Sequence, residues 1–135
     1  MMRVPESPDA RSARSWTVLR VALAVLLSAH GWVRFIGGGV LPFGEWLTSQ
    51  GVPFGPLIAG AITGIEILGT LLFAIGIGVF PLSIIFAAIY TVGAVMVHLP
   101  DGWFVVGAGR NGMEYSVLLI VCLLLVGWQH KRLVK

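Results

Sequence analysis

The pattern of hydrophobic and polar positions divides the chain into four long apolar segments separated by short polar or turn-rich stretches. The apolar segments cover residues 16–35, 57–80, 81–99 and 112–128. A hydrocarbon core about 30 Å thick needs about 20 helical residues at about 1.5 Å each, and the segments approach that length. The pattern therefore predicts an all-α fold: an integral membrane antiparallel four-helix bundle.

Turn signals place the boundaries between these segments. No charged residue occurs between Glu66 and His98, a run too long for one span, and Gly76, Gly78 and Pro81 mark the turn inside it. We therefore expect the second and third helices to form a hairpin with a very short connection.

Glycine and proline also punctuate residues 36–56 and 100–111, which are predicted to be loops. The first loop is rich in apolar side chains. It is interpreted as lying on the membrane surface or re-entering slightly, with a short helical turn near Glu45-Trp46-Leu47.

The two ends of the chain predict its orientation. Residues 1–15 are polar and are expected to form a disordered tail up to Trp16, and residues 129–135 form a basic tail. Basic residues near both ends place both termini in the cytoplasm and both loops outside. For the first segment a signal peptide is the competing interpretation, because Val21–Ala29 resembles its apolar part.

Composition agrees with a membrane protein and excludes several other classes. Hydrophobic residues make up 57% of the chain and charged residues 11%, whereas soluble domains carry about a quarter charged residues. The net charge of +3 sits mainly at the chain ends, with no basic stripe for a nucleic-acid partner. The single Cys122 excludes an internal disulfide, a Cys-x-x-Cys redox pair and an iron–sulfur cluster within the chain, and it is expected to pack as a small apolar residue.

Five ionisable residues fall inside or at the ends of the predicted spans. Such residues are costly in a bilayer and usually face a bundle interior or a water-filled cavity. The predicted topology gathers them in the outer half of the membrane, and the deepest of them lies about 13 Å below the start of the second helix. They are His30, Arg34, Glu66, His98 and Glu114.

Three interpretations of these residues remain open. One is a buried polar network that fixes the register of the bundle. Another is a pocket, open to the outer side, for a small molecule, a quinone head group or a proton. In that pocket Glu66 would carry a proton unless Arg34 or a protonated histidine compensates its charge. A haem held by His30 and His98 is the least favoured, because two isolated histidines are weak evidence. No metal-ligand spacing is visible, so no metal site is predicted.

Small residues on the second helix suggest close helix packing. Gly60 and Gly64 form a Gly-x-x-x-Gly pair, and Gly69 follows Glu66 by three positions. Small residues let helices approach closely in lipid. The pattern fits either tight packing inside the bundle or dimerisation.

The polar motifs together resemble those of the DoxX family of small four-helix bacterial membrane proteins, over residues 18–128. The family often has a lysine at the place of Arg34. The segments that carry the resemblance are His30-Gly31-Trp32-Val33-Arg34-Phe35, Gly64-Ile65-Glu66-Ile67-Leu68-Gly69, His98-Leu99-Pro100-Asp101-Gly102-Trp103-Phe104 and Asn111-Gly112-Met113-Glu114-Tyr115.

This resemblance implies a location in the bacterial inner membrane and a link to quinones or sulfur redox chemistry, because the family is named after a subunit associated with thiosulfate:quinone oxidoreductase. We expect a membrane subunit of a redox system in which Glu66 and the histidines handle protons and Arg34 holds an anionic or carbonyl oxygen.

Whether the chain is itself an enzyme stays open, because it contains no redox centre of its own and would need a bound quinone or a partner subunit. The alternative is a non-catalytic accessory or structural subunit that packs against a larger complex. The expected partners are the lipid bilayer, other subunits of a membrane complex, or further copies of the chain.

Overall fold

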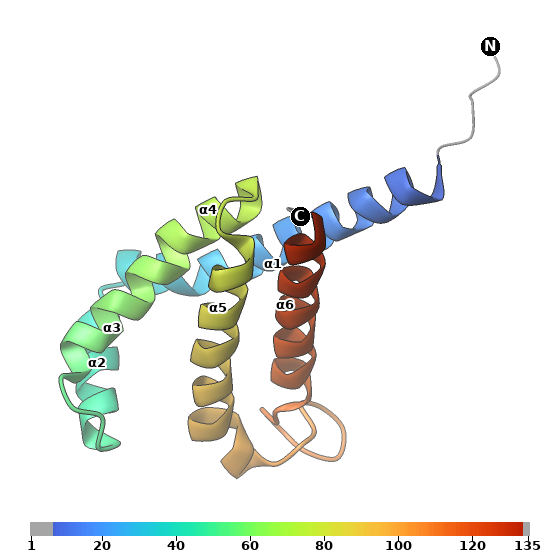
Figure 1. Ribbon diagram of the computed structural model, residues 1–135. Coiled ribbons are helices and arrows are strands. Elements are labelled where there is room, and N and C mark those ends of the chain that lie inside the picture. The colour runs from blue at the N-terminus through green and yellow to red at the C-terminus, as the bar shows by residue number, and fades with distance from the viewer. Residues whose placement is uncertain (1–6, 134–135) are drawn as a thin grey trace.

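The computed structural model describes residues 7–133, and nearly all of this part is helical (Figure 1). Two π-helical turns, η1 (Ile65–Gly69) and η2 (Ala94–His98), join α3 to α4 and extend α5, and a 3₁₀ turn, η3 (Leu99–Asp101), follows η2. Among the described residues there is no strand, so the predicted all-α class is confirmed. The α-helices are α1 (Pro8–Ile36), α2 (Val40–Ser49), α3 (Gly55–Gly64), α4 (Thr70–Ile75), α5 (Val79–Gly93) and α6 (Glu114–Leu133).

Three helical segments of the described chain are long and apolar enough to cross a membrane. They are Asp9–Ile36, Gly55–Ile75 and Val79–Asp101. Each of the four predicted apolar segments forms a helix, and the prediction of a helical, multi-pass membrane protein is confirmed. The fourth crossing, by α6, stays a prediction, since the polar residues at both ends of this 20-residue helix leave it a shorter apolar stretch.

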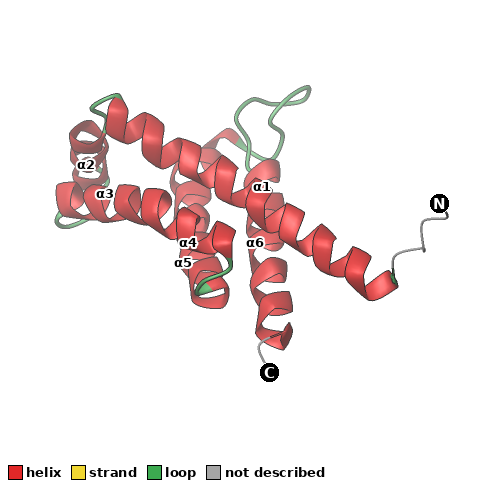
Figure 2. Cartoon of the chain, turned by 90° about the horizontal axis from the view of Figure 1, so that it is seen from above, coloured by secondary structure: helices red, strands yellow, loops and turns green. Residues whose placement is uncertain are grey.

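The helices pack as two neighbouring layers. α1 runs alongside α3, η1 and α4, while α5 packs along α6, which also touches α1 (Figures 1 and 2). Buried apolar side chains from α1, α4, α5 and α6 meet where the layers cross. Phe73 of α4 and Phe86 of α5 lie edge to face with their ring centroids 5.7 Å apart. The core also contains Leu23, Leu27, Val79, Leu123 and Val126.

A two-glycine turn joins α4 to α5. Gly76 and Gly78 have φ angles of +91° and +62°, a left-handed conformation that glycine adopts without steric cost. This confirms the predicted short connection between the second and third spans.

Helix α1 begins earlier than predicted. Residues 8–15, expected to be part of a disordered tail, are helical. The Ser7 hydroxyl accepts a hydrogen bond from the Ala10 backbone N–H at 3.2 Å, and Pro8 occupies the first helical position. These N-terminal signals explain the longer helix. Residues 1–6 of the predicted tail lie outside the described part of the chain.

The other boundaries move by a few residues. The second and third predicted helices shift to Gly55–Ile75 and Val79–Asp101. The fourth begins at Glu114 and continues to Leu133, so the basic tail expected at 129–135 starts as part of α6. Residues 134 and 135 are not described.

The loop expected over residues 36–56 contains a ten-residue helix, α2, of which the predicted turn near Glu45-Trp46-Leu47 is a part. Proline at position 42 is tolerated because it lies in the first turn, where its missing N–H is not needed. Helix α2 packs closely on the start of α3. A Cβ at Gly44 would lie only 3.1 Å from the carbonyl carbon of Gly55. Sequence reasoning counted Gly55 as a loop signal, whereas this glycine serves close helix packing.

Among the glycines on the second span, Gly69 faces Leu82 and Phe86 of α5, whose side chains would lie 3.3 Å from a Cβ at this position. A Cβ at Gly60 or Gly64 would meet nothing within 4 Å, so close packing inside the chain does not explain these two positions. Their role in dimerisation stays a prediction.

Candidate functional site

A buried ion pair joins the end of α1 to the middle of the second span. The Arg34 Nη1 donates to Glu66 Oε2 at 2.6 Å and to the Thr63 hydroxyl oxygen at 3.2 Å. The Arg34 and Glu66 side chains are 18% and 3% exposed. The guanidinium carbon also lies 4.4 Å from the centroid of the Phe43 ring of α2, a cation–π contact. Arg34 therefore supplies the positive charge that a carboxylate in this buried position needs.

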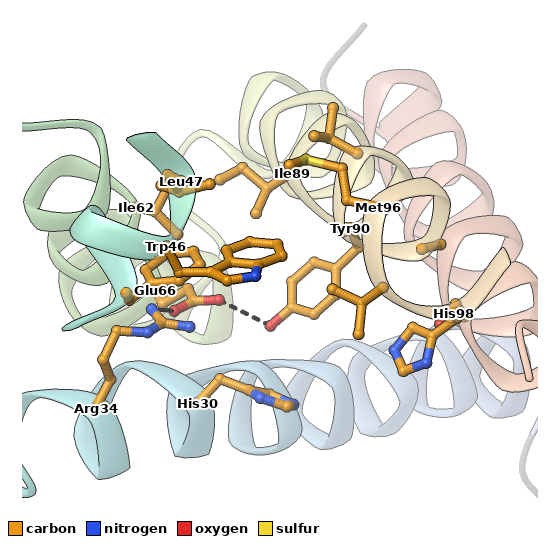
Figure 3. Close-up of a pocket in the computed structure, with 16 residues that line it drawn as sticks. His30, Arg34, Trp46, Leu47, Ile62, Glu66, Ile89, Tyr90, Met96 and His98 are labelled. Carbon is orange, nitrogen blue, oxygen red and sulfur yellow. Dashed lines mark hydrogen bonds and ion pairs between the residues drawn. The ribbon is translucent and has the colours of Figure 1, made fainter. Parts of the chain in front are cut away.

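Tyr90 of α5 completes the surroundings of this carboxylate. Its hydroxyl donates to Glu66 Oε1 at 3.1 Å, so both carboxylate oxygens have a partner (Figure 3). The ring of His30 lies edge to face with Tyr90, with centroids 5.9 Å apart. Sequence reasoning missed Tyr90. The available signal was a tyrosine within an uncharged span, since a buried tyrosine hydroxyl usually finds a hydrogen-bond partner.

The π-helical turn η1 positions Glu66. The Thr70 hydroxyl, one turn later, donates to the Glu66 carbonyl at 2.6 Å and lies 3.0 Å from the Ile67 carbonyl. Helix α1 approaches this turn at Gly31, where a Cβ would lie 2.9 Å from the Glu66 Cβ. Glycine at position 31 therefore brings α1 close enough for Arg34 to reach Glu66. Turns of this kind occur frequently at functional sites.

His98 ends the second π-helical turn, η2, and contacts the following loop. Its Nδ1 lies 2.8 Å from the Asn111 carbonyl oxygen. Because a carbonyl oxygen only accepts, Nδ1 is the donor, and in the neutral ring Nε2 is left as an acceptor. The Asn111 amide donates in turn to the Asp101 carboxylate at 2.7 Å. The loop thus fixes the tautomer of this histidine.

Glu114 does not join the other predicted site residues. It lies at the start of α6, where its carboxylate accepts a hydrogen bond from the Val105 backbone N–H at 3.2 Å. This contact holds the loop between η3 and α6. The structure therefore brings together four of the five predicted residues and gives Glu114 a structural contact.

These four residues surround a cavity of about 230 Å³, which we call the polar cavity. Figure 3 shows His30, Arg34, Glu66, Tyr90 and His98 around its lower side, with apolar side chains above them. Helix α2 covers one end of the cavity, a contribution that sequence reasoning missed because it expected a loop there. The apolar lining includes Phe43, Trp46, Leu47, Ile62, Ile89 and Met96.

A model of the family described as DoxX matches residues 15–99. The chain belongs to the DoxX family. The matched region of this DoxX protein includes His30, Arg34, Glu66 and His98, and it ends before the loop and α6. No curated protein and no solved structure matches the chain.

The arrangement combines charge compensation with several hydrogen-bonding groups. A guanidinium has five N–H donors in a fixed geometry, and only Nη1 is directed at Glu66 and Thr63. His98 offers an acceptor nitrogen and Tyr90 a hydroxyl. Within the described chain, no group of three or more His, Cys, Asp or Glu side chains could hold a metal ion. The geometry suits recognition of a polar group and exchange of protons with it.

Proposed function

We propose that this DoxX family protein is a small membrane subunit of a redox system that binds a quinone head group, or a small molecule of similar chemistry, in the polar cavity. The observation that supports this most directly is the group formed by Arg34, Glu66 and Tyr90, set in the wall of a largely apolar cavity. A few placed polar groups in an apolar hollow are typical of ligand sites.

In this proposal each polar residue has a separate task. Arg34 holds a carbonyl or anionic oxygen of the ligand, because Arg34 has donors beyond those directed at Glu66. Glu66 and the two histidines exchange protons, which a quinone takes up when it is reduced. The electrons come from a partner subunit of the bacterial inner membrane, and the polar cavity faces the outer side.

The alternative is an accessory subunit without a ligand, and one observation supports it. Both oxygens of the Glu66 carboxylate are already engaged by groups of the same chain. The cluster would then serve only to join three helices, and the protein would act by packing against a larger complex.

A binding measurement distinguishes the ligand-binding role from the accessory role. The purified protein in lipid nanodiscs would be titrated with a benzoquinone carrying one isoprene unit, while quenching of tryptophan fluorescence is followed. Trp46 lines the cavity, so saturable quenching is expected in the wild type and a much smaller response in Trp46→Phe. The absence of saturable binding, together with co-purification of a stable protein partner, would support the accessory role.

Two glycines provide a matched pair of variants. Gly93 lines the polar cavity, and a Cβ there would meet nothing within 4 Å, so Gly93→Leu places new atoms in open space at the cavity. Gly60→Leu adds the same side chain at an exposed helix position. We expect Gly93→Leu to weaken binding about tenfold or more, which corresponds to ~1.4 kcal/mol, and Gly60→Leu to bind as the wild type does. Equal binding by both variants would exclude the cavity as the site.

A further inference from the structure

A second hollow lies on the other side of the residues that close the polar cavity. It measures about 430 Å³ and runs between α1, α5 and α6, and we call it the apolar groove. Its walls are leucines of α1 and α6 together with Cys122, and His30 and Tyr90 form its polar end. The ionisable side chains that line the groove are those of His30, Tyr90, Tyr115 and Cys122.

The two hollows meet at His30 and Tyr90, because both residues line both of them. His30 is exposed and Tyr90 is half-buried, so this contact separates the hollows without sealing either. The polar cavity alone is smaller than the roughly 300–1,000 Å³ of typical small-molecule sites, whereas the two hollows together fall within that range. The charged side chains of Arg34 and Glu66 line the polar cavity, whereas leucines line most of the apolar groove. The two hollows together therefore offer a polar end and an apolar end, as an amphiphile has.

The apolar groove is open to lipid along its length. Leu26 of α1 and Leu118 of α6 line the groove and are 61% and 60% exposed. A molecule dissolved in the bilayer can therefore reach the groove sideways, without passing through water. Isoprenoid quinones are such molecules, with a carbonyl-bearing head and a long apolar chain.

We propose that the apolar groove holds the isoprenoid chain of the ligand whose head group lies in the polar cavity, with the chain passing over the His30–Tyr90 contact. The inference rests on the proposed function, because it identifies the ligand class of the same site as a prenylated quinone. Free water-soluble anions and head groups without a chain would fill only the polar cavity.

The physics of the bilayer determines which experiment can test this. Lipid tails are as apolar as the leucines of the groove, so moving a chain from lipid into the groove gains little free energy. Chain length should therefore change the affinity only slightly. The position of the chain is the informative quantity, and photo-crosslinking reports it.

The probe is a prenylated benzoquinone with a photoreactive diazirine near the end of its chain, bound to the protein in nanodiscs. We expect mass spectrometry to find the crosslinks on the two leucine-rich walls, near residues 19–27 and 118–122. Labelling there should fall about tenfold in Gly93→Leu, which blocks the head, and stay unchanged in Gly60→Leu. A phospholipid with a diazirine in its acyl chain should label the groove equally in all three proteins.

The outcomes separate the two proposals. If the short-chain quinone binds but the long-chain probe labels lipid-facing residues at random, or if its groove labelling survives in Gly93→Leu, the groove holds bulk lipid and this inference is wrong. If the short-chain quinone does not bind at all, the proposed function itself fails.

Discussion

Glu66 is 2% exposed, and the stability of its site depends on three side chains from different helices. A carboxylate in a low-dielectric interior is tolerated only when its charge is matched and its oxygens accept hydrogen bonds. Arg34 provides the charge and Tyr90 a second donor. The cluster therefore links α1, η1 and α5. Removal of any one of the three side chains leaves at least one of the others without its partner.

Removal of the arginine alone should be the most damaging change at this site. Arg34→Met leaves Glu66 without its cation, and we expect a loss of about 3–5 kcal/mol in the free energy of unfolding. The double variant Arg34→Met/Glu66→Gln should recover most of this loss, because no uncompensated charge remains. Unfolding in mixed micelles provides the measurement, and Arg110→Met in the exposed loop is the control. A single variant as stable as the control would contradict the prediction.

The tyrosine hydroxyl should contribute less than the arginine. Tyr90→Phe removes one hydrogen bond to a charged acceptor and little volume, so the expected cost is about 1.5–3 kcal/mol. Tyr115→Phe, at an exposed position of α6, is a matched control expected to be neutral. The same unfolding assay, with helical content followed by circular dichroism, would reject the assignment if both variants behaved alike.

At the scale of the elements, the two π-helical turns and one glycine determine the geometry of the site. η1 and η2 each interrupt a membrane-spanning helix beside the polar cavity and carry Glu66 and His98. Gly31 sets the distance between α1 and η1. Small changes at these positions should disturb the site without removing any of its polar groups.

A side chain at position 31 should force α1 away from η1. Gly31→Val places a Cβ 2.9 Å from the Glu66 Cβ and 3.3 Å from the Glu66 carbonyl carbon, so backbone must move. We expect a loss of about 1–3 kcal/mol in the free energy of unfolding. Gly60→Val has the same change in helix propensity and meets nothing within 4 Å. Equal destabilisation by the two variants would show that the close approach of α1 to η1 has no energetic role. The same pair tests dimerisation: a reduced dimer fraction in Gly60→Val alone would place Gly60 in a dimer interface.

The elements that sequence reasoning predicted are those set by long-range physical requirements. Span length, the absence of charge between Glu66 and His98, and the rarity of charge in lipid identified the spanning helices and the Arg34–Glu66 group. The features it missed depend on local geometry. Helix α2 was obscured by the glycines and prolines at and around its two ends, of which Gly55 packs closely on it. The turns η1 and η2 leave no periodic signal because they change only the hydrogen-bond register. Residues 8–15 were read as a tail, although Ser7 and Pro8 are helix-starting residues.

At the scale of the molecule, the polar cavity and the basic end of α6 lie at opposite ends of the third span, because His98 lines the cavity whereas Lys131 lies beside Phe80. Figure 1 shows the turn between α4 and α5 and the end of α6 at the top, with the loops after α2 and η3 at the bottom. Lys131 stacks on Phe80 beside this upper turn, its Nζ 4.7 Å from the ring centroid. Positive charge favours the cytoplasmic side. From this distribution we predict that the polar cavity lies in the outer half of the membrane.

Site-directed labelling tests this orientation and the fourth crossing together. In a Cys122→Ala background, Val106→Cys in the exposed loop should react with a membrane-impermeant maleimide in intact spheroplasts. Ser12→Cys and Lys131→Cys, exposed near the two ends, should react only after the membrane is permeabilised. Because α6 separates position 106 from position 131, opposite accessibility of these two sites requires α6 to cross the bilayer. Equal accessibility would leave α6 on one side, and labelling of Ser12→Cys from outside would invert the whole arrangement.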